Sequence, residues 1–528
     1  MGNIGSSSLA AGTAVGIQNV PFSASAEVLP RKVLIISTAL SSHVQNVITG
    51  KPFPVLSPED VADKTGAGGM AHRLSLAVTR GSSGSVPVYL LIEDDNGAAT
   101  PATGTITLTN EGPHAAGVLS LYVAAKLYAI PIIVADTVSS IAAKIVAAIN
   151  ADDSAPVTAD HVDGVVTVTS KSLGPWGNGI TVAINQRLEQ NQAVPDGLNI
   201  AIAAMTGGAG LPDLADDLPK ALGSGDSANK EFFTDVVHGY GDDATILSAL
   251  SQYVGEGNDF VQLYSRLVSR PFRSLCGSVA SGSAGLANLI TLANARLQDR
   301  CNGLIARPGS LTHPQEIAAE AIGYMAMVNN DAAEAGYTGA VLSGMDPGIV
   351  AADQGQDWTT EYTARDLAVK SGISPTIIDG GSVLAQNIVS FYRPASIPVV
   401  SNMYRRMRDI SITQNVLNAV KVTFSSGKWQ NFTVVADVMT VQNARSRAKA
   451  RDIGMVKDDL LALINAFMAR GWLFETSYSI GELKKPDAVQ LRAGGTGFDN
   501  TIKLIYSGEG NITDTIVYVD CAFSILGI

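Results

Sequence analysis

The chain has 528 residues, and its formal net charge is −12. This acidic balance excludes a protein that binds nucleic acid through its overall charge. The three cysteines (Cys276, Cys301, Cys521) form no CxxC pair, which argues against a zinc site or a disulfide framework and fits assembly in a reducing cytoplasm. No window reaches the roughly 18 apolar residues of a membrane span, and the N-terminus lacks a signal-peptide pattern, so we expect no stable membrane insertion.

The charged fraction of the chain is 16%, below the roughly 25% of typical soluble domains, while 46% of the residues are hydrophobic. A large monomer needs more charge on its surface than this. A subunit that buries much of its surface against copies of itself does not. The composition therefore favours self-association, with an alanine-rich enzyme as the alternative. The length suggests about three to four domains.

The first segment, residues 1–29, is rich in glycine, serine and alanine and has no periodicity, so we expect an N-terminal arm. Two short apolar runs follow, at residues 32–38 and 86–93, and each fits a buried strand. Asp94 and Asp95 end the second run. We assign residues 30–95 to the N-terminal part of the core.

Residues 96–205 form a predicted β-rich insertion. Within it, apolar residues at three- and four-residue spacing predict a helix with Asp136 as its N-terminal cap and Asn150 at its end. Asp163 and Gly164 are a two-residue hairpin signal between two strands. The apolar face of the helix consists of Val138, Ile141, Ile145 and Ile149.

The pattern alternates between strands and helices over residues 206–356. Such repetition predicts a central, mostly parallel α/β sheet between helices, with right-handed crossovers. One of these helices begins near His313-Pro314. The predicted strands are residues 232–237, 274–280, 303–306 and 339–342.

The last predicted domain, residues 357–512, is of the α+β class. It opens with a hairpin signal at residues 379–381. Long helices are predicted from residue 403 to about 417 and from residue 456 to 470, the second with Gly471 as its C-terminal cap and with Leu460, Ile464, Phe467 and Met468 on one face. Strands are predicted at residues 501–505 and 514–526, so residues 513–528 form a C-terminal arm strand.

Several phrases of the chain, taken together and in order, carry a family resemblance. They are a helix ending in AAIN, the phrase DGVVTVTSKSLGPWGNGI, the junction AIAAMTGGAGLPDL (residues 201–214), the hairpin ISPTIIDGG and the final α/β block. With these the chain resembles the contractile tail sheath proteins of Mu-like bacteriophages. The N-terminal arm departs from that pattern because it lacks the usual Ile-Pro-x-x-x-Arg-x-Pro opening, and the C-terminus differs from a simple single-strand ending.

The resemblance implies a structural subunit without cofactor, metal or catalytic residues. The central α/β domain would be subtilisin-like, residues 357–512 would face the tail tube, and the insertion would lie on the outer surface. Subunits would form a helical stack of hexameric rings around the tube and contract to drive it through the host envelope. The implied partners are other copies of the chain, the tail tube protein, and baseplate and tail terminator proteins, in a virion assembled in the host cytoplasm. A headless tail-like bacteriocin is the alternative particle.

A subtilisin-like fold requires that a hydrolase be considered. His238 follows a predicted strand near several aspartates, and Ser281 and Ser283 lie in a small-residue loop. The chain lacks a GxSxG elbow and a subtilisin-type nucleophile motif, so we expect His238 to donate to the backbone at a strand end. The other histidines are isolated, and no P-loop or EF-hand spacing occurs. A surface adhesin is disfavoured by the missing signal peptide.

Two features of the sequence are candidates for contacts with other proteins, namely the terminal strands and the basic clusters. Terminal strands expose unpaired backbone groups that pairing with a neighbouring subunit would satisfy, with pairing inside the same domain as the alternative. The candidates for this pairing are Val15, Ile17, Val20, Ile516, Tyr518, Val519 and Phe523. Basic clusters are the candidates for contact with an acidic tube, with a solvated face as the alternative; they are Arg445, Arg447, Lys449 and Arg451, and Arg405, Arg406 and Arg408.

Overall fold

The computed structural model describes residues 28–110, 112–187, 190–223, 231–254, 271–346, 358–393, 404–492 and 494–508. These residues form two compact units. The large unit is Val28–Leu417 and the small unit is Asn418–Gly508, and the boundary between them falls within helix α10 (Met407–Ser425). The candidate strand residues Val15, Ile17, Val20, Ile516, Tyr518, Val519 and Phe523 lie outside the described residues.

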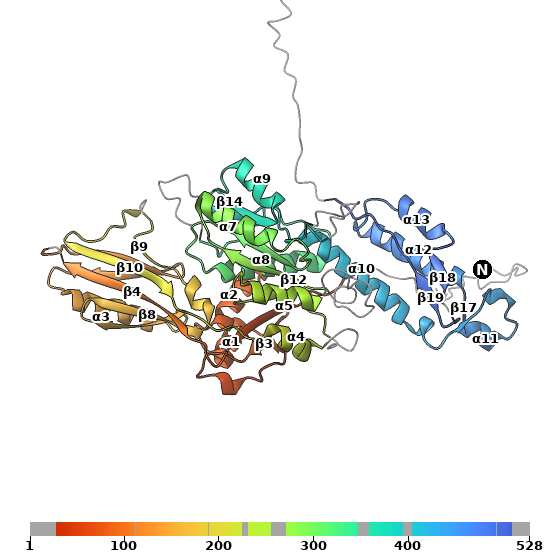
Figure 1. The fold of residues 1–528 in the computed structure, drawn as a ribbon, viewed down its shortest axis with the longest axis horizontal. Coiled ribbons are helices and arrows are strands. Elements are labelled where there is room, and N and C mark those ends of the chain that lie inside the picture. Colours follow the sequence, from red (N-terminus) through yellow and green to blue (C-terminus); the bar gives the residue numbers. More distant parts are fainter. Residues whose placement is uncertain are drawn as a thin grey trace, which may run out of the picture. The chain divides into compact units, whose positions relative to one another are not determined.

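An eight-stranded sheet with the order β15-β14-β13-β12-β11-β1-β3-β2 forms the centre of the large unit (Figure 1). Six neighbouring strands are parallel, and the two edge strands, β2 and β15, are antiparallel to their neighbours. The strands are β1 (Val33–Thr38), β2 (Phe53–Val55), β3 (Val88–Glu93), β11 (Asp235–His238), β12 (Arg273–Ser278), β13 (Asn302–Ala306), β14 (Ile373–Asp379) and β15 (Ser382–Ala385). The fold is therefore mixed α/β with a mixed sheet, as the alternating pattern predicts.

The predicted strand at residues 339–342 is wrong. Residues 339–342 lie beside β15 and make backbone hydrogen bonds to Ala385 and Val383, but the pairing amounts to an isolated bridge between Val341 and Leu384 and not to a strand. The other strand predictions in the sheet are confirmed to within a few residues. β1 and β12 are buried along their whole length, which is typical of parallel strands covered on both faces and explains the continuous apolar run of β1.

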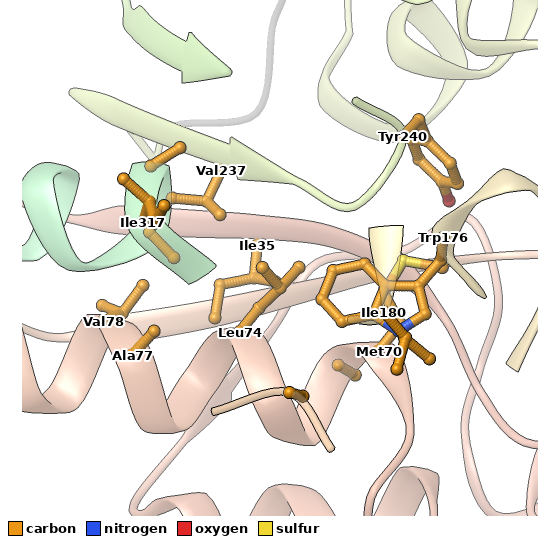
Figure 2. Close-up of a cluster of buried hydrophobic side chains, with 14 of the residues drawn as sticks. Ile35, Met70, Leu74, Ala77, Val78, Trp176, Ile180, Val237, Tyr240 and Ile317 are labelled. Atoms are coloured by element: carbon orange, nitrogen blue, oxygen red, sulfur yellow. The ribbon is translucent and has the colours of Figure 1, made fainter. Parts of the chain in front are cut away.

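Helices α2 and α8 lie side by side against the sheet (Figures 1 and 2). Their backbones are so close that a Cβ at Gly81 would lie 2.0 Å from the carbonyl oxygen of Glu320. A Cβ at Gly323 would lie 2.4 Å from the carbonyl oxygen of Val78. Glycine is required at both positions because any side chain would separate the helices. The helices of this unit are α1 (Pro58–Thr65), α2 (Met70–Ser82), α4 (Leu214–Leu222), α5 (Ala244–Val254), α7 (Gly282–Asn294), α8 (Pro314–Asp331), α9 (Tyr362–Lys370) and the first part of α10.

The insertion between β3 and α4 contains two antiparallel sheets, with the strand orders β10-β4-β8-β7 and β6-β5-β9. The hairpin at Asp163-Gly164 is confirmed, since Val162 pairs with Val165 across it. Helix α3 ends at Asn150 as predicted, but its cap is Thr137, whose side chain accepts from the Ser140 amide. Its elements are β4 (Pro101–Asn110), β5 (Gly117–Val123), β6 (Lys126–Ile132), α3 (Val138–Asn150), β7 (Val157–Val162), β8 (Val165–Leu173), η2 (Pro175–Gly179), β9 (Val182–Ile184) and β10 (Leu198–Thr206).

The described part of the small unit contains one long helix, α12 (Ile453–Ala469), shorter helices and two two-stranded sheets. Gly471 has the left-handed φ of +74° expected after a helix, so the predicted C-terminal cap of α12 is confirmed. Met468 is 42% exposed and does not share the buried face of this helix, contrary to prediction. Residues 501–505 form no strand, although Ile505 accepts from the Phe474 amide beside the isolated bridge from Tyr506 to Leu473. The elements are β16 (Thr433–Val434), α11 (Ala444–Lys449), β17 (Ala450–Arg451), α12 (Ile453–Ala469), α13 (Ser477–Lys484), β18 (Val489–Leu491) and β19 (Phe498–Asn500).

Candidate functional site

The point where ligands usually bind in a doubly wound sheet is filled in this chain. The strand order reverses between β1 and β11, and ligands bind such sheets outside the carboxyl ends of the strands at this place. Here Trp176, from helix η2 of the insertion, lies beside Met70 and Ile180, with Tyr240 nearby (Figure 2). A Cβ at Gly239, directly after β11, would lie 1.9 Å from the Met70 sulfur.

His313 fixes Trp176 in this position. The two rings stack with 3.7 Å between their centroids. His313 Nδ1 accepts from the Gln315 amide at 3.1 Å, and this assigns the proton to Nε2, which donates to the Trp176 carbonyl at 2.9 Å. Burial lowers the pKa of His313 to about 4, so the ring is neutral near pH 7. The predicted helix start at His313-Pro314 is confirmed, and its histidine also attaches the insertion to the core.

A cleft of about 540 Å³ lies beside Trp176, lined by the loops that follow β11 and β12 and by the start of α8. Two of its polar side chains, Asp243 and Ser278, have structural roles, whereas the buried Tyr240 Oη and Trp176 Nε1 have no hydrogen-bond partner among the described residues. Asp243 accepts from the amides of Thr245 and Ile246 at the start of α5. Ser278 accepts from the Ala280 amide at 3.1 Å. Neither group is left to activate a nucleophile.

His238 does not form a catalytic triad with the described residues around it. Its Nδ1 accepts from the Tyr240 amide at 3.4 Å, so the expectation that it donates to the backbone is wrong in direction. Burial lowers the pKa of His238 to about 4. Asp235 instead binds Arg273, with 2.5 Å between Oδ1 and Nε. In the described part of the chain, no group of three or more His, Cys, Asp or Glu side chains could hold a metal ion.

A buried polar cluster lies at the amino ends of β1, β11 and β12. Arg273 and Asp235 are both fully buried, and Arg273 also donates to Asn329 and Tyr337. Arg31 donates to Gln414 and Ser411 on α10, and its pKa is lowered to about 10 by burial and then by the charge of Arg273. Among the described residues, Asp235 thus pairs with Arg273 alone, while Arg31 is held by neutral groups, and its bonds to Gln414 and Ser411 attach α10 to the sheet.

The root of the predicted N-terminal arm enters at the same place. The Leu29 amide donates to Asn415 Oδ1 at 2.7 Å, and the Arg31 amide donates to Asn330 Oδ1 at 3.1 Å. Leu29 is buried. The described chain thus begins with backbone bonds to the side chains of two helices. Sequence reasoning missed this cluster because its members are far apart in the chain; a lone Arg-Lys pair before an apolar strand was the only signal.

The basic candidates divide into three environments. Arg445, Arg447 and Lys449 on α11 are exposed. Arg451 is buried, donates to the Lys428 carbonyl at 2.9 Å and lies over the ring of Trp429. Arg408 is also buried, pairs with Asp409 at 2.9 Å and donates to the Glu334 carbonyl. Arg405 and Arg406 are half-buried. Arg408 and Arg451 are buried and donate hydrogen bonds within the chain, so they are not available to a partner.

Comparisons with known proteins show what the chain is similar to. No family model matches the chain. Over 184 residues the chain is 26% identical to the Mu-like prophage FluMu tail sheath protein of Haemophilus influenzae, a match that covers 35% of this chain and 37% of that protein. The chain thus spans just over a third of the length of this relative. It is similar in sequence to a Mu-like tail sheath protein, as its motifs indicate.

Solved structures align over most of the chain. The sheath tail protein of Desulfitobacterium hafniense is 11% identical with a TM-score of 0.41, covering 88% of this chain and 90% of that one. The sheath tail protein of Listeria innocua is 13% identical with a TM-score of 0.38, covering 92% and 94%. The PVC sheath complex of an extracellular contractile injection system, in its contracted state, is 9% identical with a TM-score of 0.40, covering 98% of this chain and 99% of that one.

Among the described helices, none is both long and apolar enough to cross a membrane.

Proposed function

We propose that this chain is a contractile tail sheath subunit, which polymerises into a helical stack of hexameric rings around a tail tube and contracts to drive the tube through a host envelope. The observation that carries the proposal is the sequence match to a Mu-like tail sheath protein. The low charged fraction supports it, because a subunit in a lattice needs less solvated surface. We propose a virion as its location and baseplate and tail terminator proteins as further partners.

The large unit has the construction of a rigid body. Trp176 and His313 lock the insertion to the carboxyl edge of the sheet, and the Arg31 cluster locks α10 at the amino edge. Contraction would then move whole units, with the stored energy in the contacts between subunits, as in other bistable interfaces. We further propose a subtilisin-like fold for the central α/β domain, an outward position for the insertion and a tube-facing position for residues 357–512.

Terminal arms would connect the subunits. We propose that residues 1–29 and 513–528 pair with strands of neighbouring copies, since heterologous contacts of this kind generate open helical arrays. The buried root at Leu29 supports this proposal because it provides a fixed starting point for such an arm. The candidate strand residues named above keep this role as a proposal.

Helix α11 is the proposed contact with the tube. Its three exposed basic side chains, Arg445, Arg447 and Lys449, suit an acidic partner. Each exposed ion pair would contribute about 0–1 kcal/mol, but the contact repeats in every subunit. Such a surface could hold an extended sheath on its tube and still release it on triggering.

The test is assembly of truncated chains. Purified full-length chain should form tubes in negative-stain electron microscopy. Deletion of residues 1–27, which keeps Leu29 and its bond to Asn415, or of residues 509–528 should abolish the tubes and leave the melting temperature unchanged. Tubes of normal form from both truncations would contradict the arm mechanism. Absence of tubes from the full-length chain at all ionic strengths would contradict the proposed function. No observation among the described residues favours the hydrolase alternative.

A further inference from the structure

Three arginines gather at the amino-terminal edge of β13 and β14. Ser390 donates to the Arg405 carbonyl at 2.8 Å, and Val389 makes a bridge with Arg406, so residues 389–393 run beside residues 404–406. The Arg393 amide donates to the Leu297 carbonyl, just before β13. We call Arg393, Arg405 and Arg406 the arginine edge.

The arginine edge has no counter-charge within the described residues. None of its three side chains forms an ion pair there, and residues 394–403 contain no aspartate or glutamate. Arg393 donates to the Lys370 carbonyl at 3.2 Å and to Asn294 at 3.0 Å. Burial lowers the pKa of Arg393 and of Arg405, and the charge of the neighbouring arginine lowers each further. Holding half-buried cations together without carboxylates costs free energy that a partner would offset.

Acidic residues gather at the opposite edge of the same sheet. β3 ends at Glu93 and is followed by Asp94 and Asp95, and Asp242 follows β11, two strands away. We call these four residues the acidic edge. Glu93 is 3% exposed, and its Oε1 has no hydrogen-bond partner in the part of the chain that the structure describes. Burial and then the charges of Asp217 and Asp94 raise the pKa of Glu93 to about 7.

The two edges have opposite charge and lie at opposite ends of parallel strands. β3, β1, β11, β12, β13 and β14 all run in one direction, so their amino ends share one edge and their carboxyl ends share the other. Among the described residues, no member of either edge is in an ion pair. Copies of a chain with a net charge of −12 repel one another unless unlike patches meet. A head-to-tail contact between copies would bring such patches together and would extend without closing.

We propose that the arginine edge of one copy binds the acidic edge of a second copy. The proposal rests on the proposed function for its lattice, but the contact itself is a pairwise one. It assigns Arg405 and Arg406 to contacts between subunits, whereas Arg445 and Arg447 on α11 remain the proposed tube contact. We name a second copy as the partner of the arginine edge because every copy of this chain carries the acidic edge.

Charge reversal tests the contact. We expect the double variant Arg405→Glu/Arg406→Glu and the double variant Asp94→Lys/Asp95→Lys each to raise the concentration needed for self-association by about tenfold or more, that is by about 1.4 kcal/mol. An equimolar mixture of the two should restore association, because each negative arginine edge then meets a positive acidic edge. Sedimentation measures association, and electron microscopy measures tubes. The matched control, Arg470→Glu/Arg492→Glu, reverses two exposed charges outside both edges and outside α11, and it should associate like the wild type.

Folding is checked by the melting temperature of each variant, and the milder Arg405→Gln/Arg406→Gln replaces a variant that unfolds. Normal association of both reversed variants overturns the inference, and so does a mixture that fails to recover. If the reversed variants associate normally and lose only tube binding, the arginine edge belongs to the tube contact, and the inference is overturned. A wild type that associates in a charge-dependent way but forms no tubes overturns the proposed function and leaves the contact supported. A wild type that does not associate overturns both.

Discussion

Two buried arginines of the large unit and two exposed arginines of α11 have contrasting roles. Arg31 and Arg273 are fully buried, and they donate hydrogen bonds to side chains of α8 and α10. In the small unit, Arg445 and Arg447 are exposed on a helix of six residues. Buried cations stabilise a single arrangement because they cannot be moved without losing their partners, whereas exposed cations can change partners at little cost. The basic residues that serve the fold and those available to a partner therefore separate by burial, which the sequence does not display.

Asp235→Ala gives the sharpest test of this comparison. It removes the carboxylate that Arg273 binds and leaves a buried cation uncompensated, so we expect a loss of about 3–5 kcal/mol in the free energy of unfolding. Denaturant unfolding measures it. The exposed Asp216→Ala is the control and should change little. A loss for Asp235→Ala no larger than that of its control would contradict the structural role of the cluster.

Trp176→Ala removes the side chain that fills the carboxyl edge of the sheet. We expect a loss of about 3–5 kcal/mol, because a large buried aromatic is replaced by a cavity. Limited proteolysis should then cut between the insertion and the core before the core itself. Phe474→Ala, at a site that is 70% exposed, is the matched aromatic control. Equal protease resistance of wild type and Trp176→Ala would argue against the lock between insertion and core.

The buried histidines make the large unit sensitive to acid. Burial lowers the pKa of His238 from 6.5 to about 4, so the unfolded chain takes up a proton before the folded chain does. The stability that neutral, buried His238 contributes is therefore fully present above pH 6.5. The free energy of unfolding then falls by up to about 3 kcal/mol as the pH drops from 6.5 to 4. His238→Asn keeps an acceptor for the Tyr240 amide and should flatten the pH dependence of unfolding in this window. If the free energy of unfolding fell equally with pH in the wild type and in the variant, His238 would not be a source of the acid sensitivity.

Changes on α11 should have the smallest effect on stability. Arg445→Ala/Arg447→Ala removes two exposed side chains, so we expect the melting temperature to change by less than about 2 °C. Binding of the assembled sheath to a purified acidic tail tube should nevertheless weaken, as a co-sedimentation assay can measure. A large drop in melting temperature would mean that these arginines belong with the buried group.

Local pattern was sufficient to predict most elements of this fold. The spacing of Ile141, Ile145 and Ile149 predicts α3, and Asp163-Gly164 predicts its hairpin, because both signals act over a few residues. Contacts between distant segments were not predictable. Trp176 and His313 are 137 positions apart, and Arg31 and Gln414 are 383 apart. The predicted strand at residues 339–342 also depended on a distant partner, β15, with which Val341 forms only an isolated bridge.

The bond between Leu29 and Asn415 determines where a pull on the first residues of the chain would be felt. Tension there would reach helix α10 directly, and the Arg31 bonds to Ser411 and Gln414 would spread it into the sheet as shear across several short polar contacts. Within the large unit, the buried polar side chains of α10 would thus carry load from the first residues of the chain into the sheet.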